Sequence, residues 1–149
     1  MRLFQKKIRR ALRILRSYNI NCKVTSEEFL RYVTAPTLTG DTTKLEDILE
    51  NDFLMIHEII EICKFKELGI SIDRNIFLRN PDLAYELHLE AMKIELDYAR
   101  RKNDLEWIRK RVNDLESYLD DPNLPASLRK ICLKIIKDYM EILSESRKS

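Results

Sequence analysis

The sequence predicts an all-α fold, a single domain over residues 1–149 built as a bundle of about five or six helices around a long central helix. Only two glycines and four prolines interrupt the 149 residues. Leucine, isoleucine and charged side chains that favour helices are abundant. Apolar residues also recur at three- and four-residue spacing through most of the chain. The length suits one hydrophobic core, and no linker-like composition divides it.

The first helix is expected over residues 2–18, within a basic N-terminal segment, 1–24, that ends in an extended connector. Residues 1–26 hold eight basic and no acidic residues, whereas the remainder holds 19 basic and 25 acidic ones. A basic amphipathic helix can bind an anionic partner or pack as an ordinary terminal helix. The residues of this first helix that would contact nucleic acid or an acidic protein are Lys6, Lys7, Arg9, Arg10, Arg13 and Arg16.

A short second helix should follow, because Thr25 and Glu28 have the spacing of a capping box. It is expected to end before Pro36, and a threonine-rich loop then spans residues 34–43. The loop lacks the glycine pattern and the lysine that a phosphate-binding P-loop requires. We interpret it as a surface connection.

The central helix is predicted as one piece from Thr43 to Gly69. Thr43 begins a second capping box, and Gly69 is placed to follow the last helical turn. This stretch is apolar on more than one side, which is typical of a helix packed by neighbours on several faces. His57 and Glu61 interrupt its second face. Polar groups in such a position need partners.

Three more helices are predicted in the second half of the sequence. A connector over residues 70–80 holds one helical turn, and Asn80 with Pro81 marks the start of a helix that runs to about Lys102. The next helix begins near Asn103, and a turn at residues 121–125 precedes the last one, over about 126–144. Residues 144–149 should fray. Trp107 and Arg111 have the spacing of a cation–π pair.

Four polar residues form the candidate site. If the helices 43–69 and 81–102 pack as an antiparallel hairpin, His57, Glu61, His88 and Glu95 could share one interhelical space. Facing helices of bundles build metal sites from such ligands, which also suit acid–base catalysis. The interpretation that we favour from the sequence is a buried salt-bridge network, in which the histidines pair with the glutamates, and the metal or acid–base site is the alternative. The run HEIIE lacks the second histidine of a zinc-protease motif. We expect no cofactor, and the sequence does not identify a metal.

Two functions follow from these patterns. We expect a non-enzymatic intracellular binding module for a protein or nucleic-acid partner, and the alternative is a metal-dependent or acid–base enzyme at the four-residue site. Cys22, Cys63 and Cys132 are interpreted as small buried hydrophobes in a reducing cytosol. No membrane-spanning run or signal peptide is recognised, so a cytoplasmic location is expected. A single glutamine and the high charge favour a thermophilic source. A homo-oligomer stays open.

Overall fold

The structure is a computed structural model that describes residues 2–37 and 44–146. Every regular element in these residues is helical, which confirms the all-α prediction. Six α-helices have seven or more residues, so the predicted number differs only by the short helices α3 and α5. The elements are α1 (Arg2–Leu15), η1 (Arg16–Tyr18), α2 (Ser26–Val33), α3 (Leu45–Leu49), α4 (Asp52–Glu67), α5 (Ile76–Arg79), α6 (Pro81–Arg101), α7 (Leu105–Tyr118) and α8 (Ala126–Ser146).

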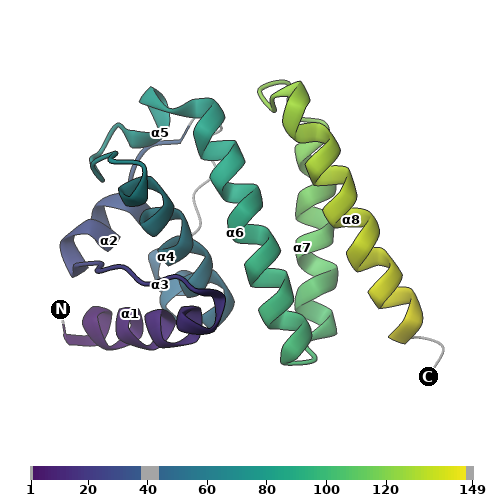
Figure 1. The fold of residues 1–149 in the computed structure, drawn as a ribbon, viewed down its shortest axis with the longest axis horizontal. Helices are drawn as coiled ribbons and strands as arrows, with labels where there is room; N and C mark the ends of the chain where they lie inside the picture. The colour runs from purple at the N-terminus through teal and green to yellow at the C-terminus, as the bar shows by residue number, and fades with distance from the viewer. Residues whose placement is uncertain (1, 38–43, 147–149) are drawn as a thin grey trace. The chain divides into compact units, whose positions relative to one another are not determined.

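The chain forms two compact units, Met1–Ala91 and Met92–Ser149. The first contains α1 to α5 and the first half of α6, and the second contains the rest of α6 with α7 and α8 (Figure 1). Each unit is described by itself, and the single domain predicted over 1–149 stays a prediction. None of the described helices is both long and apolar enough to cross a membrane.

Helix α4 is the centre of the first unit. Helices α1, α2 and α3 all pack against it. Its residues face the core on several sides, because Ile56, Ile59, Ile60, Ile62 and Phe65 are all completely buried. This is the packing expected of a helix that is apolar nearly all round, and the prediction that this stretch is central is confirmed.

The prediction of one unbroken helix from Thr43 to Gly69 is wrong. Asn51 has extended backbone, and its side chain accepts a hydrogen bond from the Leu54 N–H, so it caps a new helix, α4, after α3 has ended. The other end agrees with the prediction, since Gly69 follows α4 with φ +78°. Thr43 and most of the predicted threonine-rich loop lie outside the described residues.

The first two helices agree with their sequence signals. The predicted helix 2–18 is α1 followed by the short turn η1, which ends at Asn19 with φ 60°. The capping box of α2 is confirmed, because the Thr25 hydroxyl accepts from the Glu28 N–H and the Glu28 carboxylate accepts from the Thr25 N–H. These two hydrogen bonds therefore fix the start of α2 directly after Thr25.

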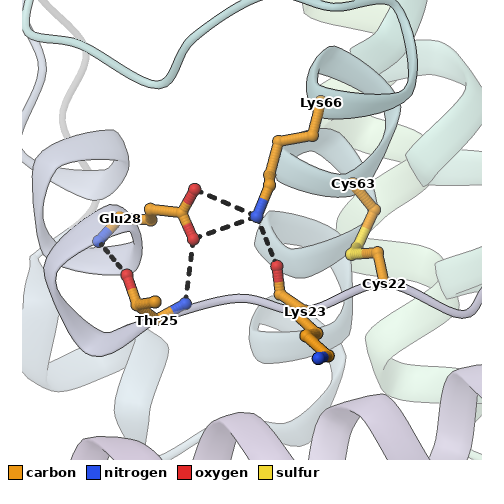
Figure 2. Close-up of a disulfide and its surroundings, with 6 residues drawn as sticks. All are labelled: Cys22, Lys23, Thr25, Glu28, Cys63 and Lys66. Carbon is orange, nitrogen blue, oxygen red and sulfur yellow. Dashed lines mark hydrogen bonds and ion pairs between the residues drawn. A yellow bond between two sulfur atoms is a disulfide. The ribbon is translucent and has the colours of Figure 1, made fainter.

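Cys22 and Cys63 form a disulfide, which overturns their interpretation as free thiols (Figure 2). The bridge joins the connector before α2 to α4, with Cα atoms 6.0 Å apart, a normal separation for a disulfide. The two cysteines are 41 positions apart on different elements, and sequence spacing does not encode such a pairing. Cys132 is free and buried, as expected.

Lys66 lies beside this bridge and joins the same two segments. Its ammonium donates to the Lys23 carbonyl oxygen and pairs with the Glu28 carboxylate, 3.0 Å away (Figure 2). Since Glu28 also takes part in the capping box, the charge of Lys66 stabilises the start of α2 against α4.

In the second unit, α7 and α8 pack together through buried apolar side chains, among them Ile108, Leu115 and Ile135. Helix α6 ends where Asn103 adopts φ 57°. The side chain of Asp104, and not that of Asn103, then caps α7 by accepting from the Trp107 N–H.

Glu28 makes the stability of the first unit depend on pH. Partial burial raises its pKa, but hydrogen bonds from Thr25 and the charge of Lys66 outweigh this and lower the pKa below the usual 4.5. A lowered carboxyl pKa contributes stability above the unfolded value, and this contribution is lost as the pH falls through the folded value. Glu28→Gln should therefore reduce the free energy of unfolding at neutral pH, with the difference shrinking in acid.

Urea unfolding over a pH series measures this difference. The exposed neighbour Glu27 provides the matched control, Glu27→Gln. Identical pH profiles for the two variants would contradict the assignment.

Candidate metal centre

Three of the four predicted site residues come together in the first unit. His57 Nε2 lies 2.6 Å from Glu61 Oε2, and His88 Nδ1 lies 3.1 Å from the same oxygen. The two imidazole nitrogens are 3.0 Å apart. Each side chain thus offers one ligand atom, and the three atoms form a small triangle.

Helix geometry explains why these residues meet. His57 and Glu61 are four residues apart on α4, so they lie on one face of it. His88 lies two turns after the start of α6 at Pro81. The chain returns from α4 to α6 through Gly69 and the short helix α5, and this brings the His88 ring to 4.7 Å from that of His57, centroid to centroid.

The cluster is buried on the α4 side and partly open on the α6 side. His57 and Glu61 are only 2% and 6% exposed, whereas the side chain of His88 is 24% exposed. His88 is therefore the least buried member of the cluster.

Tyr32, on α2, is a fourth member that the sequence analysis did not single out. Its hydroxyl donates to Glu61 Oε1, which leaves Oε2 to the two histidines. Burial, followed by the negative charges of Glu61 and Glu58, raises the pKa of Tyr32 well above its usual value. The phenol therefore stays protonated and remains a donor. Its ring packs against Phe65 and Phe77.

Glu61 is ionised in this environment. Burial alone would raise its pKa, but the charge of His57 and hydrogen bonds from both histidines outweigh burial and lower the pKa below the usual value. The charged His57 that lowers this pKa is protonated, so the shift describes an ion pair between the two side chains; a metal ligand would require His57 to be neutral.

Ion pairs from both imidazoles to Glu61 Oε2 account for two sides of the triangle, as in the buried salt-bridge network expected from the sequence. At each of the three atoms, the directions to the other two differ by roughly 60°. An imidazole N–H that points at Glu61 Oε2 therefore points well away from the nitrogen of the other imidazole. If both imidazoles donate to Glu61 Oε2, His57 Nε2 and His88 Nδ1 face each other 3.0 Å apart with no proton between them. A cation above the triangle would instead receive one lone pair from each residue.

The distances fit such a cation. An ion about 2.1 Å from each of the three atoms would bind them at angles of roughly 75–95°. This is the geometry of one face of an octahedron, in which two histidines and a carboxylate leave the opposite positions open.

Glu95 is not part of this cluster, which corrects the predicted four-residue site. Its fully buried carboxylate accepts two hydrogen bonds from Arg111, at 2.8 and 3.0 Å, and one from the Trp107 indole N–H, all in the second unit. The guanidinium of Arg111 also lies 5.7 Å from the Trp107 ring centroid, which confirms the predicted cation–π pair. Burial lowers the pKa of Arg111, but the charge of Glu95 outweighs it and raises the pKa.

The predicted basic surface lies on α1 and, for Arg16, at the start of η1. Lys6, Arg9, Arg10, Arg13 and Arg16 are exposed and Lys7 is half-buried. The guanidinium of Arg10 forms an ion pair of 2.9 Å with Asp52 at the start of α4, so one of these charges is used within the first unit.

No protein-family model matches the chain, and neither do the curated proteins or the solved structures with which it was compared.

The Glu95 network predicts a large loss of stability when only one partner is removed. Arg111→Leu leaves a buried carboxylate without its cation, and we expect the free energy of unfolding to fall by about 3–5 kcal/mol. The double variant Arg111→Leu/Glu95→Leu removes both charges and should recover most of that loss. Chemical denaturation of the three proteins measures this, and equal stabilities for the single and double variants would refute it.

Proposed function

We propose that the first unit binds a divalent transition-metal ion through His57, Glu61 and His88, and that the chain is a metal-dependent enzyme at this site. The observation that carries the proposal is the triangle of one carboxylate oxygen and two imidazole nitrogens, separated by 2.6 to 3.1 Å. The favoured function is therefore the enzyme that the sequence analysis treated as its alternative.

The ligand set favours zinc, iron, manganese or cobalt. Imidazole suits zinc and iron, and two histidines with one glutamate also form known catalytic zinc sites. Three protein ligands leave coordination positions for water and substrate. An ion held there would lower the pKa of bound water and polarise a carbonyl or phosphoryl oxygen.

Tyr32 supports the same proposal. Metal-ligating carboxylates are usually held by a further hydrogen bond that fixes their orientation. The Tyr32 hydroxyl supplies such a bond to the Glu61 oxygen that faces away from the histidines. Three candidate metal ligands and an outer hydrogen bond to one of them therefore lie in one place, which supports the proposal.

Metal content and thermal stability test the proposal. Protein purified without added metal should contain about one transition-metal ion per chain, and added metal at 100 times its Kd should stabilise the apo form by about 2.7 kcal/mol. His57→Ala and His88→Ala should abolish both effects. Glu95→Gln, which alters a buried carboxylate outside the cluster, should retain them.

Two results would overturn the metal centre. One is protein without metal whose melting temperature is unchanged by zinc, cobalt or manganese. The other is retention of stoichiometric metal in both histidine variants.

We propose as a second candidate that α1 binds an anionic partner, with a nucleic acid as the first case. The supporting observation is that Lys6, Arg9 and Arg13 lie exposed on α1 and that Arg16 lies exposed at the start of η1. Such a surface binds phosphates through counterion release, and affinity then falls steeply with salt. A protein partner with an acidic surface would use the same charges.

Binding of single- or double-stranded RNA and DNA at low salt tests this candidate. Arg9→Ala/Arg13→Ala should weaken binding and lower the log–log salt slope by about 0.7–0.9 per lost phosphate contact. Lys130→Ala/Lys137→Ala removes two exposed charges from α8 and is the matched control. No binding at low salt, or equal losses in both variants, would remove the nucleic-acid version.

A further inference from the structure

The connector after η1 and helix α2 are fastened to α4 in three ways. Cys22 is bonded covalently to Cys63, and Lys66 holds the Lys23 carbonyl oxygen and the Glu28 carboxylate. The third attachment is the hydrogen bond from Tyr32 to Glu61. Figure 2 shows the first two side by side.

The attachment points on α4 are close together. Glu61, Cys63 and Lys66 fall within two turns of this helix. On the opposite segment, Thr25 and Glu28 fix the start of α2 between the disulfide and Tyr32. The disulfide is the one covalent link, and Tyr32 is the residue through which α2 reaches the candidate metal ligands.

We propose that the Cys22–Cys63 disulfide is a redox-sensitive tether that sets the metal affinity of the His57–Glu61–His88 centre through Tyr32. The inference rests on the proposed metal centre and names its regulation. With the tether closed, α2 is held on α4 and Tyr32 fixes the Glu61 carboxylate. With the tether open, the contacts of Lys66, the packing of α2 and the hydrogen bond from Tyr32 hold this segment without a covalent link, so the position of Tyr32 is less restricted.

The redox step is an ordinary thiol–disulfide exchange with a dithiol. A thiolate of the dithiol attacks Cys22 Sγ, because Cys22 is partly exposed whereas Cys63 is only 5% exposed. Cys63 leaves as a thiolate and takes up a proton. The second thiol of the reductant then displaces Cys22, so two thiols form on the protein while the dithiol becomes a disulfide. Two electrons and two protons pass to the protein.

The effect on metal affinity should be partial. Loss of a hydrogen-bonding partner of a metal ligand weakens metal binding by about 10- to 100-fold. Opening the tether frees the segment without deleting Tyr32, so we expect a weakening of about three- to tenfold, below the effect of Tyr32→Phe.

Cobalt titration of the full chain, followed by visible absorbance, tests the tether. Three samples are compared: oxidised protein, protein reduced with dithiothreitol and then freed of it without oxygen, and the same sample reoxidised. Thiol titration after denaturation should find one free thiol in the first, Cys132, and three in the second. We expect weaker cobalt binding only in the reduced sample and recovery on reoxidation.

The Tyr32→Phe variant tests whether reduction of the disulfide changes cobalt affinity through Tyr32 or through a general loosening of the first unit. If the tether acts through Tyr32, reduction should change the cobalt affinity of Tyr32→Phe by less than twofold. Cys22→Ala/Cys63→Ala should match the reduced wild type, and circular dichroism checks that it is folded. Cys132→Ala should behave as wild type in both states.

The outcomes distinguish the two proposals. Two results would overturn the metal centre and with it this inference. One is oxidised wild-type protein that binds no cobalt, and the other is a His57→Ala variant that binds cobalt as tightly as the oxidised wild type. Equal affinities of oxidised and reduced wild type, with binding still lost in His57→Ala, would overturn the tether alone. Three free thiols in the air-oxidised protein would also overturn it.

Discussion

The Glu61 carboxylate, buried inside the first unit, is the constraint on which the arrangement of its helices depends. A charged group in a helix that is otherwise apolar nearly all round is very unfavourable unless other groups compensate it. Three helices supply those groups: α2 provides the Tyr32 hydroxyl, α4 provides His57, and α6 provides His88. The angular positions of α2 and α6 about α4 are therefore tied to one carboxylate. The disulfide and Lys66 hold α2 in the same place from the other end of the segment.

Glu61 and Glu95, the two buried carboxylates among the described residues, are compensated by different chemistry. Glu95 meets a guanidinium that forms two hydrogen bonds with it, together with an indole N–H, and all of these partners can only donate. These donors occupy three of the roughly four acceptor positions of the Glu95 carboxylate, and none of them presents a lone pair to a ligand. Glu61 instead meets two imidazoles, each of which can present a lone pair when neutral. The buried charge of Glu95 is thus compensated by an arginine and a tryptophan in the second unit. The buried charge of Glu61 is compensated in the first unit by two histidines that, we propose, also bind a metal ion.

Local signals in the sequence predicted most of the helices. The capping box at Thr25, the glycine after α4 and the proline at the start of α6 each act within one turn, so no tertiary information was needed. Face assignment also succeeded for Glu95, because seven residues after His88 is nearly two full turns. The predicted position of Glu95 along the helix was wrong. Glu95 lies about 10 Å beyond His88 along α6, and its partners there come from α7. The disulfide and Tyr32 were missed because each depends on how α2 and its connector dock on α4.

Anomalous X-ray diffraction from crystals of the full chain grown with zinc tests the metal centre most directly. We expect one anomalous peak in the first unit, about 2.1 Å from His57 Nε2, Glu61 Oε2 and His88 Nδ1, with solvent or a small ligand completing the coordination. The absence of a peak at this point, with the two imidazoles and the carboxylate in direct contact as a closed network, would contradict it.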